Sequence, residues 1–524
     1  MKKYKWTLRL LVLPLFLASL SIPSCTKKLT EHVYSSETAN NYYATADQVT
    51  AAYVQPYSFL QTLIYSVHFA LEEFPTDEAV VTVKAGQGYE NGQWIRFHQH
   101  SWTSGEDFLQ YEWSNMFQGV GYCNNFIDAM QNRDVSKFSL PVSKDQMIAE
   151  TKLMWAMYYY WAMNDFGNIP IVDHLGVQSP PTQSRADVFA FIEQEIKNNM
   201  GQLGEKGDAT WYGHFTRTAA HALLAKLYLN AEVFTGTARW DDCISECDSI
   251  INSGLYSLDS SWQTPFLVNN QTSNENIWVV PFDAQYAPGF NATIQQTYGA
   301  LKDKFHFVDY PWSKVVTQES FFDLYSKNDK RINQWLAGPQ YYDNGDTVLG
   351  WYDQDSKPFV IYPHIDMLNN ANGGYGQGVC NEKYQIQPGT ADNLIQDNMN
   401  NDLVVFRLAD IMMMKAECLM RKAGGSAPQT AVDLVNNVRA RAFDAGAQGA
   451  RYTTATLTLD EMLNERGREF AYEMKRREDL IRFGKFEGAW WEKTADGDKH
   501  REIFPVPRNI LTVNPALKQN PGYE

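Results

Sequence analysis

The densest group of potentially reactive side chains lies in the segment ERGREFAYEMKRRED, residues 465–479. Two carboxylates at a suitable separation can carry out glycoside hydrolysis, and this segment offers several. However, Glu465 precedes Arg468 by three residues and Glu473 precedes Arg477 by four, which is the spacing of ion pairs on one helix face. Arginine also joins helices through bidentate bonds to carboxylates. We therefore predict a structural role for this segment and expect no catalytic residue in it.

Other motifs give little support for a metal or cofactor site. FHQHS places His98 and His100 on one side of an extended segment, but no third ligand follows at close spacing. The glycines of GGYGQG, residues 373–378, are not followed by the Lys-Ser/Thr pair of a phosphate-binding loop. Cys243 and Cys247 lie four residues apart on an expected helix, where buried thiols are more typical than a zinc site. We expect no metal ion and no cofactor.

Aromatic residues are unusually abundant, at 14% of the chain. Flat rings match the apolar C–H faces of sugars, and a pocket with aromatic walls and a few polar groups suits a glycan. Many of these rings fall in segments without helical periodicity. The candidate ligand-binding residues are Trp94, Trp102, Tyr286, Phe290, Trp312, Tyr341, Trp351 and Tyr375. The alternative for any single ring is packing within a loop, so the prediction is that several of this set line the site.

The N-terminus has the pattern of an export signal. Four basic residues occur within the first nine, and an apolar stretch follows at 10–20. This stretch is shorter than the roughly 20 apolar residues that span a bilayer. LSIPSC, ending at Cys25, resembles a bacterial lipobox. The resemblance predicts that 1–24 is a lipoprotein signal peptide and that acylated Cys25 anchors the protein to a membrane.

The charge balance limits the classes of partner. The 524-residue chain has a net charge of −16, and removal of 1–24 takes away four basic residues and no acidic ones, which gives −20. Nucleic-acid binding needs basic patches, so we expect no nucleic-acid partner.

Helical periodicity dominates two parts of the chain. In RTAAHALLAKLYLNAEVF, residues 217–234, apolar side chains recur along one helix face. The segment 150–165 shows a similar stripe and ends before Gly167, a usual helix stop. Further helices are expected at 46–63, 107–131, 185–200, 239–253, 402–423, 428–443 and 459–474.

Successive helices form pairs of tetratricopeptide-like size. The helix at 214–234 is followed closely by 239–253, and the helix at 402–423 by 428–443. Stacked pairs of this kind share a core. We predict a mainly α fold in which residues 25–524 form one domain, with a helical scaffold at about 40–256 and 402–485.

Two long insertions interrupt this scaffold, at about 74–105 and 257–400. They are rich in Gly, Asn, Asp and aromatic residues. Long irregular segments in compact proteins are usually functional or disordered, and the aromatic content argues against disorder. We expect ordered loops that carry the ligand-binding residues.

Several motifs, taken in order, resemble those of one family. They are AETKLMWAMYYYWAMNDFGNIPIV, FRLADIMMMKAECL, VDLVNNVRARA, LNERGREFAYEMKRREDLIRFGKF and IFPVPRNILTVNPALKQNPGY. With Cys25 at the front, they span nearly the whole chain and resemble the SusD/RagB family of outer-membrane nutrient-binding lipoproteins. The family has no sequence motif at its ligand site, so no binding residue can be carried over.

The resemblance implies a function and a partner. It implies a non-catalytic lipoprotein, anchored at the outer membrane and facing the cell exterior. It also implies capture of oligosaccharides for a SusC-like TonB-dependent β-barrel transporter. The stretch after Cys25 begins Thr26-Lys27-Lys28, whereas surface-exported lipoproteins of this kind often have acidic residues there. Two alternatives stay open: capture of peptides by the same architecture, and a helical surface glycoside hydrolase.

Overall fold

The computed structural model describes residues 42–208, 210–387, 389–390 and 398–523. The predicted signal peptide and Cys25 lie outside the described residues. The chain divides into two units, 1–48 and 49–524, and the description below concerns the second. No described helix is both long and apolar enough to cross a membrane.

Long helices are the main regular elements of residues 49–524. Their bounds are α2 Ala46–Leu63, α5 Asp107–Gln131, α6 Lys144–Phe166, α7 Arg185–Asn199, α8 Arg217–Leu229, α10 Trp240–Ser253, α14 Leu408–Lys422, α15 Gln429–Ala440 and α16 Leu459–Phe470. The shorter ones are α3 Phe69–Glu73, α4 Gln93–His98, α9 Ala231–Thr235, α11 Ala292–Gln296, α12 Lys302–Phe305, α13 Glu319–Phe322, α17 Arg476–Arg482 and α18 Arg508–Val513. The prediction of a mainly α fold is confirmed.

Local sequence signals explain where these helices begin and end. Ser143, Ser184, Thr216 and Thr458 each cap a helix, because the side-chain oxygen accepts a hydrogen bond from the backbone N–H three residues later. Helix α10 ends at Gly254, whose φ of 66° is easily adopted by glycine. The predicted helix positions therefore agree closely with those observed.

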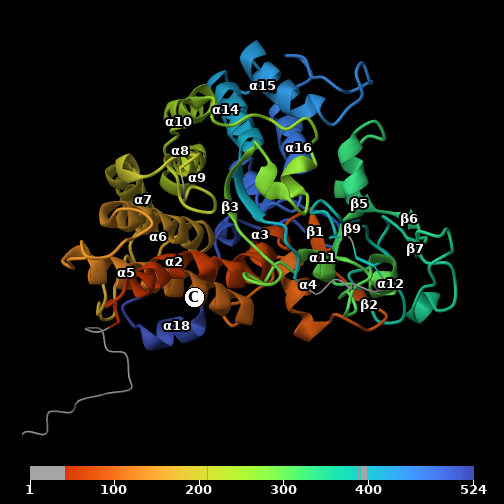
Figure 1. Ribbon diagram of the computed structural model, residues 1–524. Helices are drawn as coiled ribbons and strands as arrows, with labels where there is room; N and C mark the ends of the chain where they lie inside the picture. The colour runs from red at the N-terminus through yellow and green to blue at the C-terminus, as the bar shows by residue number, and fades with distance from the viewer. Residues whose placement is uncertain (1–41, 209, 388, 391–397, 524) are drawn as a thin grey trace, which may run out of the picture. The chain divides into compact units, whose positions relative to one another are not determined.

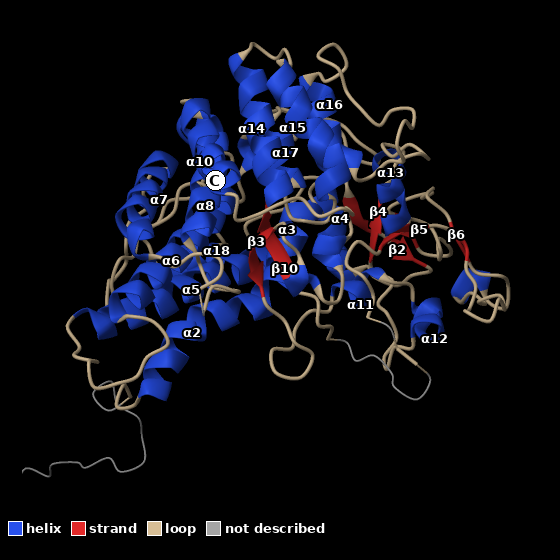
Figure 2. Cartoon of the chain, turned by 45° about the horizontal axis from the view of Figure 1, so that its top comes forward, coloured by secondary structure: helices blue, strands red, loops and turns tan. Residues whose placement is uncertain are grey.

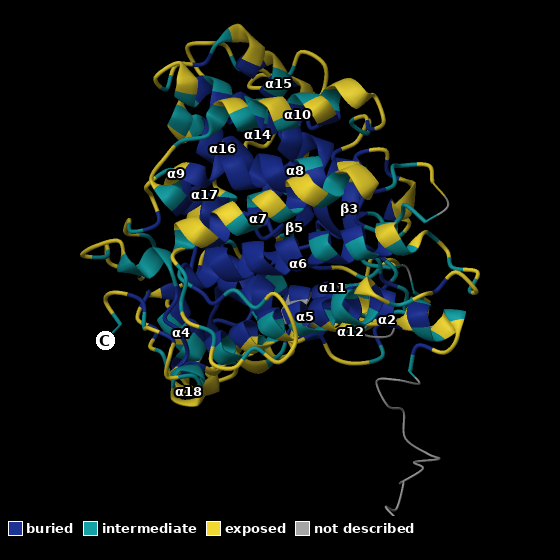
Figure 3. Cartoon of the chain, turned by 90° about the vertical axis from the view of Figure 1, so that its left-hand side faces the viewer, coloured by how far each residue is buried: buried dark blue, intermediate teal, exposed yellow. Residues whose placement is uncertain are grey.

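The helices pack in the predicted pairs. Helix α8 packs against α10, α10 against α14, and α14 against α15, while α5, α6 and α7 pack in sequence (Figure 1). Figure 3 shows that α6 and α8 are buried, whereas α7, α10 and α15 carry exposed outer faces. One continuous core joins these helices, as expected for stacked helix hairpins.

One predicted helix begins with a strand instead. Residues Leu403–Arg407 form β10, which pairs antiparallel with β3, Asn276–Val280. The sequence LVVFR is rich in β-branched and apolar residues, which favour an extended, buried backbone. The helical prediction for 402–407 is therefore wrong, and the helix starts at Leu408.

The two insertions hold the remaining described strands. These are β1 Ala79–Val81, β2 Val83–Lys84, β4 Val315–Thr317, β5 Trp335–Leu336, β6 Gly338–Pro339, β7 Val360–Ile361, β8 Asn369–Asn370 and β9 Cys380–Asn381. Strand β1 pairs with β4 and β2 with β8, so the first insertion is joined to the second by backbone hydrogen bonds. Figure 2 shows β2, β4, β5 and β6 gathered on one side of this unit, away from α7 and α10.

Candidate ligand-binding cavity

A cavity of about 670 Å³ opens where the two insertions meet. It is lined by three short segments: 82–90 around β2, 310–314 before β4, and 351–352, with Tyr375 beside the last. This volume is within the range of small-molecule sites. We call it the aromatic cavity.

Four aromatic rings with exposed or partly exposed surface line the aromatic cavity. Tyr310, Trp312 and Tyr352 are each about half exposed, at 59%, 51% and 52%. Trp351 is partly buried, and its ring contacts Tyr310 edge-on at 4.9 Å between centroids. A group of exposed rings in one cavity is unusual unless it meets a partner, since together they leave a large apolar area in water.

The backbone fixes these rings by hydrogen bonds and by two unusual conformations. Trp312 N–H donates to the carbonyl of Ile294 at 2.8 Å, and Ser313 N–H donates to that of Thr297 at 3.0 Å. Ser313 and Tyr352 have φ of 55° and 52°, a region that non-glycine residues seldom adopt. Such conformations persist where the surrounding structure enforces them, often at functional sites.

The Trp351 ring packs against the ring of a buried tyrosine. The indole ring lies nearly parallel to that of the buried Tyr375, with 16° between the planes and 6.3 Å between centroids. Tyr375 in turn accepts a hydrogen bond from Ala300 N–H at 3.1 Å, and burial raises the pKa of its phenol to about 12. Gly299 leaves room for the indole, since a Cβ there would lie 2.4 Å from a Trp351 ring atom.

Charged groups also line the aromatic cavity. Lys314 Nζ lies 3.1 Å from a carboxylate oxygen of Glu90, which also accepts a hydrogen bond from Trp94 Nε1 at 2.7 Å. Lys84 lines the same cavity, and its Nζ donates to the carbonyl of Ser313 at 3.2 Å. Burial lowers the pKa of Lys84 to about 8.

Three of the eight aromatic residues predicted to bind ligand come together here: Trp312, Trp351 and Tyr375. Trp312 and Trp351 offer ring surface, whereas Tyr375 is 2% exposed and supports Trp351. Sequence reasoning missed Tyr310 and Tyr352. The signal was present, because each lies within two residues of a predicted tryptophan in the same loop.

Three other predicted residues are buried in the core: Trp94, Trp102 and Phe290 are 2%, 1% and 0% exposed. The structure corrects their prediction as ligand contacts, because a ring enclosed by protein has no face to offer a sugar. Trp94 acts indirectly, through its bond to Glu90 and its contact with the Lys314 ammonium, 4.6 Å from the ring centroid.

The last two predicted residues, Tyr286 and Tyr341, are exposed but do not line the aromatic cavity. Tyr286 is 82% exposed in a turn closed by hydrogen bonds between Asp283 and Ala287. Tyr341 bridges to Thr347. The structure gives neither a place beside the other rings.

The carboxylate-rich segment has the predicted structural role, but most of its partners are distant in sequence. Arg407 pairs with Glu275, Glu469 and Glu473 at 2.7, 2.9 and 2.8 Å. Arg331 pairs with Asp329, Glu465 and Glu469 at 2.7–2.9 Å. We call these residues the Arg407 network. Arginine charges hold the pKa of Glu465 at about 2, against the opposing effect of burial.

The expected ion pair between Glu473 and Arg477 is absent from the described contacts. Helix α16 ends at Phe470, so Glu473 is not on it. Arg477 instead contacts Glu72 and Asp165. The shorter expected pair is present, with Arg468 Nη2 lying 2.9 Å from Glu465.

The histidines and cysteines singled out by sequence are buried. His98 Nε2 lies 2.6 Å from the carbonyl of Trp491, and burial lowers its pKa to about 4. His100 lies between Asp496 and the carbonyl of Pro75. Cys243 and Cys247 are buried free thiols, as predicted.

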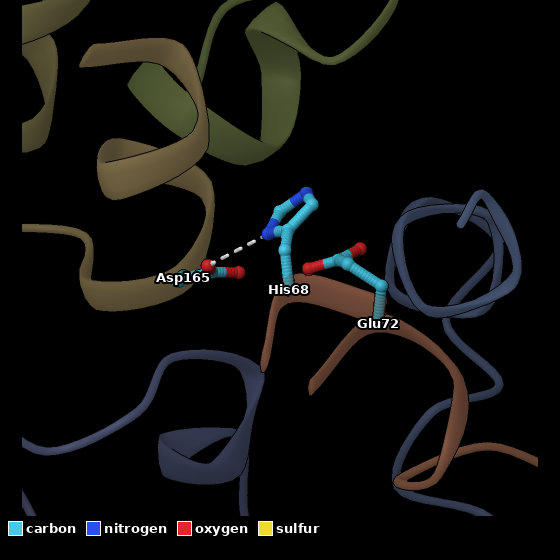
Figure 4. Close-up of side chains that lie close together, drawn as sticks. All are labelled: His68, Glu72 and Asp165. Atoms are coloured by element: carbon cyan, nitrogen blue, oxygen red, sulfur yellow. Dashed lines mark ion pairs between the residues drawn. The ribbon is translucent and has the colours of Figure 1, made fainter. Parts of the chain in front are cut away.

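One described group has the composition of a metal site: His68, Glu72 and Asp165, shown in Figure 4. Arg477 Nη1 lies 3.1 Å from Glu72 and 3.3 Å from Asp165, so a fixed cation already neutralises these carboxylates. His68 also contacts Glu112 at 2.8 Å. The arrangement is that of a buried ion-pair cluster, because the carboxylates already pair with Arg477 and His68.

Comparison with known proteins identifies the family. A model described as "SusD family", of SusD and RagB proteins, matches residues 274–523. A second, described as "Starch-binding associating with outer membrane", matches 57–229. Together they cover most of the chain, which belongs to the SusD/RagB family.

Individual relatives match most of the chain at low identity. The starch-binding protein SusD of Bacteroides thetaiotaomicron is 21% identical over 498 residues, covering 88% of this chain and 86% of that protein. The SusD-like protein P25 of Formosa agariphila is 24% identical, covering 78% of this chain and 79% of that protein. Surface glycan-binding protein A of Bacteroides thetaiotaomicron, solved in complex with laminarihexaose, is 19% identical and has a TM-score of 0.71 over 91% of this chain and 99% of its own.

Proposed function

We propose that the protein captures oligosaccharides in the aromatic cavity and does not cleave them. The observation that carries this proposal is the group of exposed rings on hydrogen-bonded loops, Tyr310, Trp312 and Tyr352, with Trp351 beside them. Preorganised rings lose little conformational entropy on stacking against a sugar. Relatives named for binding starch or solved with laminarihexaose support a glycan as the ligand.

The charged lining supports capture over hydrolysis. Most glycoside hydrolases use two carboxyl groups that flank the scissile bond. Among the described residues that line the aromatic cavity, Glu90 provides a carboxylate, and it is engaged by Lys314 and Trp94. The carboxylates of the Arg407 network are enclosed by protein and paired with arginine.

Delivery is the second part of the proposal. Membership of the SusD/RagB family supports a SusC-like TonB-dependent β-barrel transporter as the recipient of the captured sugar. The lipobox-like sequence supports an acylated Cys25 that holds the protein at the outer membrane, facing the cell exterior. Mass spectrometry of the N-terminal peptide and loss of membrane attachment in Cys25→Ala test the anchor. Co-purification with a TonB-dependent barrel from the native membrane tests the partner.

The deciding experiment is calorimetric titration against a panel of plant, host and microbial oligosaccharides, with product analysis of the same samples. We expect binding without cleavage. Trp312→Ala and Trp351→Ala should each weaken it about 5- to 150-fold, since an aromatic contact with a ligand contributes ~1–3 kcal/mol. Tyr341→Ala is the matched control, as it removes an exposed ring outside the cavity. Cleavage products would disprove capture without catalysis, and binding of peptides instead of sugars would favour the peptide alternative.

A further inference from the structure

Lys84 differs from the other buried lysines of the protein. Five lysines are buried in the described part of the chain, and four of them pair with a carboxylate. These four pairs are Lys226 with Glu478, Lys383 with Glu473, Lys475 with Asp410, and Lys493 with Asp496. Lys84, which is 3% exposed, has no such pair among the described contacts.

The surroundings of Lys84 satisfy its ammonium incompletely. An ammonium has three N–H donors, and one of them reaches the carbonyl of Ser313. The Tyr298 ring lies 5.9 Å away and adds a weak attraction. Removing an ammonium from water without a counter-charge costs folding free energy, which agrees with the lowered pKa. A feature that costs stability and lines a cavity indicates a functional role.

A second lysine lines the same cavity. Lys314 follows Ser313, the acceptor for Lys84, and Ser313 follows Trp312, whose exposed ring also lines the cavity. The Lys314 side chain is 19% exposed and pairs with Glu90, so part of its charge is already matched. The described charged lining therefore holds two cations and one anion, in a chain whose net charge is −16.

We propose that the aromatic cavity takes acidic oligosaccharides, with an anionic group of the sugar pairing with Lys84 while a neighbouring sugar ring stacks on Trp312. The group is a uronic-acid carboxylate or a sulfate ester, which share the negative charge and the acceptor oxygens that an ammonium requires. This inference rests on the proposed function, since it concerns the ligand of the same cavity.

The test uses matched pairs of glycans and the full-length protein in detergent. One pair is an oligogalacturonate and its carboxyl-reduced form, and the other is a sulfated galactan oligosaccharide and its desulfated form. We expect at least one acidic member to bind about tenfold or more tightly than its neutral partner, because a desolvated charge pair contributes that much or more. The pair that shows the difference identifies the anionic group.

The outcomes separate the two proposals. If neutral members bind as well as or better than acidic ones, the preference for acidic sugars is wrong while glycan capture stands. If no sugar of this panel or of the wider panel binds, both proposals fail.

A variant of Lys84 and a control that removes the same charge elsewhere test whether Lys84 causes the preference for acidic sugars. Lys84→Gln should weaken binding of the acidic sugar at least about tenfold and leave neutral sugars unaffected. Lys327→Gln removes the same charge from an exposed residue outside the cavity and should change neither. Thermal unfolding and circular dichroism of each variant confirm folding. Lys314→Gln is a second variant with the same expected direction, and unchanged acidic binding in both cavity variants would overturn the inference.

Discussion

The Arg407 network and the aromatic cavity both contain buried charge, yet they differ in how that charge is matched. In the network each guanidinium meets two or more carboxylates within 3 Å. In the cavity Lys84 meets a backbone carbonyl and aromatic surface. Charge that is fully paired inside the protein supports the fold, whereas charge left incompletely paired at a cavity is available to a ligand. Residue type by itself does not distinguish fully paired charge from incompletely paired charge.

The largest expected effect is on the stability of the network. Arg407→Met leaves Glu275, Glu469 and Glu473 short of a counter-charge, so the free energy of unfolding should fall by about 3–5 kcal/mol. Denaturant titration measures it. Lys422→Met, which breaks an exposed pair with Asp241, should change it by ~1 kcal/mol or less. A loss below ~1 kcal/mol in the Arg407 variant would show that the network is not structural.

Acid should act on the same network. The folded-state pKa of Glu465, a member of the network, is held at about 2 by neighbouring arginines, below the usual value of 4.5. The pKa of Glu417, which pairs with Arg421 and Arg482 beside the network, is held at about 2 in the same way. Their contribution is complete above pH 4.5 and is lost as the pH falls toward 2, because the unfolded chain then binds protons that the folded chain does not. We expect a loss of ~2 kcal/mol per group between pH 4.5 and 2.5. Unfolding curves that are flat across this window would contradict the comparison.

A rise in pH should change the charge of Lys84 in the aromatic cavity. The titratable or charged groups around Lys84 are Glu90, Tyr298, Lys314, Tyr375 and Cys380. Burial raises the pKa of Tyr298, Tyr375 and Cys380, so these groups keep their protons near pH 8. Lys84, with a pKa of about 8, loses its charge as the pH rises.

Affinity for an acidic sugar should therefore fall about tenfold between pH 7 and 9, while affinity for its neutral partner stays constant. Calorimetry at several pH values measures both. Lys84→Gln should remove the dependence, and a dependence that survives in this variant would assign it to another group.

The smallest expected effect concerns the support of the rings. Gly299→Ala places a methyl group against Trp351 without altering any residue that lines the cavity. We expect binding to weaken about two- to tenfold, because a displaced ring stacks less well and overpacking costs ~1–3 kcal/mol. Gly121→Ala is the control, since a Cβ there meets nothing within 4 Å. Equal affinity in both variants would show that the position of Trp351 is not critical.

Much of the helical architecture could be predicted from sequence because it depends on local signals. Apolar periodicity, capping residues such as Ser143 and Thr458, and terminal glycines such as Gly254 act within a few residues of the helices that they define. The strand at Leu403–Arg407 was missed because its conformation depends on pairing with β3, which lies more than 120 residues earlier. The family, too, could be recognised from motifs in their order along the chain.

The sequence by itself determined the helices, the abundance of aromatic rings and the family. The tertiary structure decided which rings are exposed in the aromatic cavity and which charges lack a partner among the described contacts. Trp94 and Trp312 both lie in the aromatic-rich insertions, yet one is buried and the other half exposed. Lys84 and Lys383 are both buried lysines, yet only Lys383 meets a carboxylate, Glu473, which lies 90 residues away. Burial and ion pairing depend on contacts between distant segments, so they are set when the chain packs and not by the local sequence.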